Sequence, residues 1–175
     1  CVDFPYSQDI FMDQKFLICE ETGILQIKSF PSTDLLYMTH HNDAIGGVWS
    51  DLFDDIVDVV KKRTIGKKRL KILEIGAGSA KLAEKILEAV DVENYVIIEP
   101  NPPSEIKINH PGLEIVRDYY EKSSLSHHYD LILHSHVLEH VENPIQFMES
   151  ISKNISEGSL HIFVIPNLKE TFSRK

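Results

Sequence analysis

The sequence contains only two cysteines, Cys1 and Cys19. Two cysteines cannot build the disulfide framework of a small secreted protein, so a reducing cytoplasm is the expected location. No apolar run reaches the roughly 20 residues of a membrane span, and no signal peptide opens the chain. We therefore predict a cytoplasmic protein with no membrane partner.

Positive charge is also scarce. Lys and Arg number 18 against 27 Asp and Glu, which gives a net charge of −9. A surface that binds phosphates needs clustered Lys and Arg, so no nucleic-acid partner is expected. Basic residues concentrate at 61–63 and 67–69, and we interpret this run as a solvated helix end.

The 175 residues, 42% of them hydrophobic, are enough for one ordinary domain with its own core. The chain begins with Cys1 instead of methionine and ends soon after a strongly apolar segment. We expect a fragment of a longer protein, truncated after the fifth strand of its sheet.

From Lys71 onward, apolar runs alternate with helical patterns. The expected strands lie in LKILEIGAG, NYVIIEP, LEIVRDYY, YDLILHSH and EGSLHIFVIPN. Helices are expected over SAKLAEKILEAV, capped by Ser79, and over PIQFMESISKNI, capped by Asn143. This alternation with short connections predicts an α/β fold, in which flanking helices cover a Rossmann-like parallel sheet.

A further amphipathic helix is predicted before this core, in NDAIGGVWSDLFDDIVDVVKKR. The residues that precede it are less regular. We therefore divide the chain into a small cap segment, residues 1–42, and a ligand-binding domain, residues 43–175.

A glycine-containing loop follows the first strand of the alternating region. Gly76 and Gly78 let the backbone turn sharply and approach a ligand, and Glu99 closes the next strand 21 residues after Gly78. This layout predicts a nucleotide-type site at the carboxyl ends of the strands. The loop of a dinucleotide-binding site has a third glycine at the position that Lys81 occupies here. A nicotinamide cofactor (NAD) is therefore the second choice.

The segments LEIGAGSAKLAEKI, VIIEP, YDLILHSHVLEHVENPIQFMESI and GSLHIFVIPN resemble class I S-adenosylmethionine-dependent methyltransferases. The resemblance covers about residues 71–167 and implies S-adenosylmethionine as cofactor, with S-adenosylhomocysteine as product. By this resemblance the glycine loop holds the methionine portion, Glu99 the ribose, and Asp118 with Tyr119 the adenine. The implied cofactor contacts are Glu74, Gly76, Ala77, Gly78, Ser79, Glu99, Pro100, Asp118, Tyr119, His134 and Ser135.

Physical chemistry agrees with that cofactor. A carboxylate at Glu74 attracts the ammonium group of the methionine portion, whereas it would repel the phosphates of a dinucleotide. Methyl transfer from a sulfonium needs no metal, because the leaving group is already activated. The protein then has to align donor and acceptor.

Histidines are concentrated in LHSHVLEHV, where His136, Glu139 and His140 spell a zinc-peptidase pattern. A zinc peptidase needs this pattern within one helix, whereas here it spans a strand end and a loop. The segment is also similar to ubiquinone-pathway O-methyltransferases that bind a divalent ion, so a metal role for these three residues stays open, although we predict no metal. We expect His134 or His136 to be the general base.

The segment LICEETGILQI resembles a zinc module found in methyltransferases that act on nucleotide-linked sugars. Thr22 stands where that module has its second cysteine, so the module is degenerate and its metal lost. The resemblance implies a sugar, a sugar nucleotide or a capsule-type surface glycan group as acceptor. It also offers Tyr37 and Trp49 as residues that fold over the cofactor, with core packing as the alternative for Trp49.

Two other functions fit the same layout. One is an NAD-dependent oxidoreductase, and the other is a module that binds cofactor without catalysis. Catalytic residues beyond residue 175 are also compatible with the sequence, and neither the methylated atom of the acceptor nor the oligomeric state follows from it.

Overall fold

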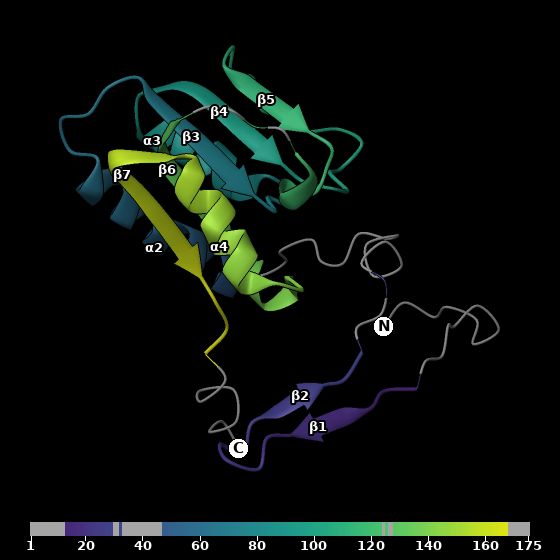
Figure 1. Ribbon diagram of the computed structural model, residues 1–175. Coiled ribbons are helices and arrows are strands. Elements are labelled where there is room, and N and C mark those ends of the chain that lie inside the picture. The colour runs from purple at the N-terminus through teal and green to yellow at the C-terminus, as the bar shows by residue number, and fades with distance from the viewer. Residues whose placement is uncertain (1–12, 30–31, 33–46, 124, 126–127, 168–175) are drawn as a thin grey trace. The chain divides into compact units, whose positions relative to one another are not determined.

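The computed structural model describes residues 13–29, 32, 47–123, 125 and 128–167 (Figure 1). The chain forms two compact units, Cys1–Met38 and Thr39–Lys175. The domain boundary predicted near residue 42, together with Cys1, Tyr37 and His127, lies outside the described residues. Within the described ranges, no helix is long and apolar enough to cross a membrane.

In the described part of the first unit, β1 (Phe16–Ile18) and β2 (Leu25–Ile27) form an antiparallel strand pair. The turn between them places Gly23 at a φ of +69° and leaves the Cys19 side chain exposed. The amide N–H of Gly23 donates to the carbonyl oxygen of Cys19 at 2.8 Å, which closes the turn.

The second unit is built on a five-stranded, all-parallel sheet with the order β5-β4-β3-β6-β7. Its strands are β3 (Leu70–Ile75), β4 (Val92–Ile98), β5 (Leu113–Val116), β6 (Tyr129–Ser135) and β7 (Ile155–Val164). The first strand of the sheet thus lies between the second and the fourth in chain order. This arrangement is the doubly wound order of Rossmann-like folds, so the predicted fold class is confirmed.

Helices cover both faces of this sheet (Figure 1). The helices α2 (Gly47–Arg63) and α3 (Lys81–Ala89) pack on one face, and α4 (Pro144–Lys153) packs on the other. Side chains of β3 alternate between the two cores, with Leu70 and Ile72 facing α2 and α3, and Leu73 and Ile75 facing α4. Both faces of β3 are apolar because both are buried.

The two helix starts differ from each other. Asn143 caps α4 as predicted, since its Oδ1 accepts from the amide N–H of Gln146 at 3.1 Å. The predicted cap at Ser79 is wrong, because α3 begins at Lys81 after Ala80, whose φ is +60°. The tight turn thus extends through Ala80, and the helix begins two residues after Ser79.

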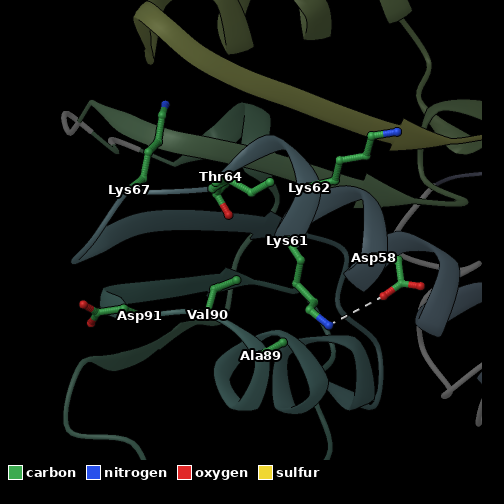
Figure 2. Close-up of a pocket in the computed structure, with 9 residues that line it drawn as sticks. Asp58, Lys61, Lys62, Thr64, Lys67, Ala89, Val90 and Asp91 are labelled. Carbon is green, nitrogen blue, oxygen red and sulfur yellow. Dashed lines mark ion pairs between the residues drawn. The ribbon is translucent and has the colours of Figure 1, made fainter.

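A surface pocket of about 550 Å³ lies where α2 ends and where the turn from α3 into β4 passes (Figure 2). Lys61 pairs with Asp58 at 3.8 Å in this pocket, and the Nζ of Lys67 donates to the carbonyl oxygen of Gly158 at 3.0 Å. The Lys61 side chain is 56% exposed. These contacts agree with a solvated helix end, and the pocket lies at the amino ends of the strands.

Gly112 provides a test of the sheet packing, because a Cβ at this position would overlap the backbone carbonyl of Glu93. We predict that Gly112→Ala lowers the free energy of unfolding by about 1–3 kcal/mol, the usual cost of overpacking. Urea denaturation followed by circular dichroism measures the change. Gly47→Ala is the matched control, since a Cβ there meets nothing within 4 Å; equal stability of the two variants would contradict the prediction.

Candidate functional site

The strands β3 and β6 are neighbours, and the connections that follow them leave toward opposite faces of the sheet. Such a switch point opens a crevice at the carboxyl ends of parallel strands, where ligands of this fold class bind. The predicted site residues lie in the last two residues of β3 and β6 or in the segments that follow β3, β4, β5 and β6. The site is therefore built from four loops on one edge of the sheet.

The loop after β3 alternates in backbone conformation. Gly76, Gly78 and Ala80 have positive φ angles of +71°, +51° and +60°. The Gly76 amide N–H donates to the carbonyl oxygen of Ile98 at 2.9 Å, which ties the loop to the end of β4. Along this path the loop presents its backbone, instead of side chains, at the amino-terminal end of α3.

Gly76 is also the point of closest approach between two loops. A Cβ on this residue would overlap the Cγ2 atom of Val137, which follows β6. Any larger residue is therefore excluded twice, by its φ of +71° and by the Val137 side chain. Sequence reasoning missed Val137, because its role depends on the neighbour relation of β3 and β6.

The carboxylate of Glu99 joins the loops after β3 and β4. Its Oε2 accepts from the amide N–H of Gly78 at 3.0 Å, and its Oε1 accepts from the amide N–H of Asn101 at 3.0 Å. The residue is 8% exposed. Each carboxylate oxygen has a second lone pair, so Glu99 retains the capacity to accept from a ligand hydroxyl.

Glu74 lies deeper, at 3% exposure, and its Oε2 accepts from the hydroxyl of Tyr95 at 2.7 Å. Burial raises the pKa of Glu74 to about 7; the Tyr95 hydrogen bond opposes this shift, and the nearby charge of Glu99 adds to it. Burial likewise raises the pKa of Tyr95 well above its usual value. Sequence reasoning missed Tyr95. The alternation of side chains along a strand could have identified it, because residues 95, 97 and 99 point to the same face of the sheet.

Three other predicted contacts follow the ends of β4 and β5. Pro100 is half-buried directly after Glu99. Asp118 and Tyr119 are half-buried two and three residues after β5 ends, and the Tyr119 amide N–H donates to the Oδ1 of Asp118 at 2.8 Å. The Nζ of Lys122 lies 4.5 Å from the centroid of the Tyr119 ring. The Asp118 carboxylate is thus held beside the same edge of the sheet.

His134 lies on the other face of the sheet from Glu74. It is 1% exposed and packs against Phe147 of α4, at 5.4 Å between ring centroids, and against Phe163 of β7, also at 5.4 Å. Among the described residues neither of its ring nitrogens has a hydrogen-bond partner. Burial, with a smaller contribution from His161, lowers the pKa of His134 to about 4. These observations make the His134 ring a poor candidate for the general base, while its role as a cofactor contact stays a prediction.

His136 and Ser135, by contrast, remain at the site. His136 has a φ of +56°, a conformation that costs a residue with a Cβ about 1–2 kcal/mol. Its Nδ1 lies 2.9 Å from the Ser135 hydroxyl, and its ring contacts Trp49 edge-on at 4.9 Å between centroids. Backbone strain of this kind is found at functional sites, where surrounding packing maintains it.

The zinc-peptidase pattern is not on one helix. His136 follows β6, while Glu139 and His140 are exposed in the short 3-10 helix η3 (Leu138–His140). In the part of the chain that the structure describes, no group of three or more His, Cys, Asp or Glu side chains is arranged to hold a metal ion.

Several solved structures share this fold. The N-methyltransferase NodS from Bradyrhizobium japonicum WM9, in complex with S-adenosyl-L-homocysteine, aligns with a TM-score of 0.59 at 16% identity over 74% of this chain and 70% of its own. Coclaurine N-methyltransferase bound to N-methylheliamine and SAH aligns at 0.55 and 14% identity, over 71% and 38%. The plantazolicin methyltransferase BpumL aligns at 0.54 and 21% identity, over 63% and 46%.

A curated relative is the ribosomal RNA small subunit methyltransferase A of Blochmanniella pennsylvanica, which is 35% identical over 63 residues. That match covers 34% of this chain and 24% of the relative. The chain thus spans about a quarter of that protein, and less than half of two of the solved structures.

A family model described as a methyltransferase domain matches residues 48–172, which include every loop of the site. The match extends over well more than half of the chain. The geometry at the carboxyl edge of the sheet and this match agree, and the chain belongs to the methyltransferase domain family.

Proposed function

We propose that this protein binds S-adenosylmethionine at the carboxyl edge of its parallel sheet and transfers the methyl group to a small-molecule acceptor. The observation that carries the proposal is a pair of buried carboxyl groups at the loop that contains Gly76 and Gly78: Glu74 precedes this loop, and Glu99 accepts a hydrogen bond from its Gly78 amide. Membership of the methyltransferase domain family and the likeness to solved methyltransferase structures support it.

Each carboxyl group suits one part of this cofactor. Glu99 is fixed by two backbone N–H donors and can accept from the two ribose hydroxyls. Glu74, below the glycine loop, can pair with the ammonium of the methionine portion. A dinucleotide would bring phosphates to the same loop, where the acid at Glu74 gives them no favourable charge and repels them when it is ionised. Asp118 is the proposed partner of the adenine amino group.

The bound cofactor supplies a methyl group activated on a sulfonium, so the chain has to orient the acceptor and accept its proton. We assign the proton-accepting role to His136, whose ring is held between Ser135 and Trp49 at the switch point. His134 is left out, because it is enclosed by aromatic rings on the other face of the sheet. Trp49 would then line the acceptor side of the site.

We propose a small molecule as acceptor because the net charge of −9 disfavours binding to nucleic acid. Within that class, sugars and sugar nucleotides are the first candidates to test. Their support is the resemblance of the Leu17–Ile27 segment to the amino-terminal module of methyltransferases that act on nucleotide-linked sugars. The solved structures of coclaurine N-methyltransferase and the plantazolicin methyltransferase make small nitrogen-containing acceptors the second group.

Calorimetric titration of the 175-residue chain with S-adenosylhomocysteine tests the cofactor, with NAD as a parallel ligand. We expect binding of S-adenosylhomocysteine alone. The variant Glu99→Gln should weaken it about 10- to 100-fold, because hydrogen bonds to a charged group contribute about 1.5–3 kcal/mol. Glu93→Gln, an exposed change on the same strand, is the control and should bind like the parent. Binding of NAD alone would replace the proposal with an oxidoreductase.

A second prediction concerns the contact between Gly76 and Val137. Gly76→Ala should abolish measurable cofactor binding and lower the free energy of unfolding by about 2–4 kcal/mol, from overpacking and from a Cβ at positive φ. The double variant Gly76→Ala with Val137→Ala should recover part of the lost stability, because it removes the overlap and leaves the strain. Additive losses in thermal or urea unfolding would show that the two loops do not touch as described.

A third prediction tests His136 as base. His136→Asn should leave the free energy of unfolding nearly unchanged, since asparagine tolerates positive φ. Turnover should fall about 10²- to 10⁴-fold, the usual contribution of a general base. Release of S-adenosylhomocysteine with a panel of sugar and amine acceptors measures it. His140→Asn, an exposed change four residues away, is the control; equal turnover in both variants would place the base elsewhere.

A further inference from the structure

Tyr95 has no role in the function proposed above, although it is among the most deeply buried side chains of the protein. It is 0% exposed in the middle of β4, on the face covered by α2 and α3. A phenol in such a place must satisfy its hydroxyl, and Tyr95 does so by donating to the Oε2 of Glu74 at 2.7 Å. The hydrogen bond runs from the core outward to the base of the candidate site.

The surroundings of Glu74 supply no positive charge. In the described ranges, no Lys, Arg or His forms an ion pair with it, and the charged group that acts on it is the Glu99 carboxylate. The side chains of β3 and α3 that pack on the same face are apolar: Leu70, Ile72, Leu82, Ala83 and Ile86. An ionised carboxylate there has lost its water and, among the described residues, gained the neutral donor Tyr95, so the neutral acid is favoured until a cation arrives.

We propose that Tyr95 is a positioning residue for Glu74, and that binding of the cofactor's ammonium group is coupled to release of one proton from the Glu74 carboxyl to solvent. The inference rests on the proposed function, because it takes the amino-acid portion of S-adenosylmethionine as the arriving cation. The O–H bond of the Glu74 acid breaks, its proton passes to the buffer, and the resulting carboxylate pairs with the ammonium. Tyr95 donates to the same oxygen before and after this step.

The protonation of Glu74 gives the expected size of the effect. Burial raises its pKa to about 7, so in the free protein the group is about 90% protonated at pH 6, half protonated at pH 7 and about 10% protonated at pH 8. If the complex holds Glu74 ionised, cofactor binding releases about 0.9, 0.5 and 0.1 proton at these three pH values. The dissociation constant should then be about tenfold weaker at pH 6 than at pH 8.

The experiment is calorimetric titration of the full chain with S-adenosylhomocysteine at pH 6, 7 and 8. Each titration is run in two buffers of different ionisation enthalpy, and the difference in observed heat gives the number of protons released. A release that falls with pH as stated, together with tighter binding at pH 8, supports the inference. Release below about 0.1 proton at all three pH values overturns it, while binding itself leaves the proposed function intact.

Two variants identify the residues involved. Glu74→Gln should bind more weakly, release no proton and lose the pH dependence, because no group titrates at position 74. Tyr95→Phe should move the midpoint of the affinity profile to higher pH, since the hydrogen bond that lowers the pKa of Glu74 is gone. Equal weakening of Tyr95→Phe at every pH would make Tyr95 a merely structural residue and overturn its positioning role.

Tyr120→Phe is the matched control for Tyr95→Phe. The Tyr120 hydroxyl is also largely buried, but it accepts from the Nδ2 of Asn154 at 2.9 Å in the core on the α4 side. Its removal should leave both proton release and the pH profile unchanged. A shift of the profile in this control would mean that general loosening of the core moves it, which contradicts a specific role for Tyr95. Proton release by the parent chain tests the coupling even if a variant does not fold.

Complete absence of S-adenosylhomocysteine binding at all three pH values would overturn the inference and the proposed function together. Binding without proton release overturns the inference alone. The two failures are therefore distinguished by the same set of titrations.

Discussion

The candidate site depends on one carboxylate that holds two loops. Glu99 accepts from the amide N–H of Gly78 with one oxygen and from that of Asn101 with the other. The residue closes β4, so its position is fixed by a strand paired on both sides. Hydrogen bonds to a charged acceptor are stronger than neutral ones, and they let the glycine loop keep the path that opens the backbone to a ligand.

The fold was predictable from the sequence, because its signals are local and repeated. Five apolar runs with helical patterns among them predicted a parallel sheet, and each run holds most of one observed strand. The runs contain β3, β5 and β6 entirely, whereas β4 and β7 begin two residues before theirs. The cap at Asn143 was predictable for the same reason. The start of α3 was not, since Ser79 is an acceptable cap in isolation. Ala80, which has a left-handed backbone conformation, is the residue before the helix instead.

The site was predicted less completely, and strand alternation explains why. Glu74 pairs in register with Leu133, so their side chains share one face and His134 must point to the other. This assignment of faces can be made only when β3 and β6 are known to be neighbours, and sequence motifs do not show which strands pair. The same alternation places the side chain of Tyr95, four residues before Glu99, on the same face as that of Glu99. The sequence alone therefore predicted the two acids, and the sheet shows Tyr95 hydrogen-bonded to one of them.

Glu74 shows how a buried acid can select a ligand. A carboxyl group at 3% exposure is hard to ionise, and its ionisation becomes favourable when a cation replaces the lost water. A ligand with an ammonium group gains this interaction, while a ligand that brings phosphates gains none from Glu74. The neutral form of Glu74 avoids strong repulsion between the two acids until that cation binds. Selectivity for a cationic cofactor then follows from the absence of a basic partner beside Glu74 within the described chain, and Tyr95 keeps the acid oriented in both protonation states.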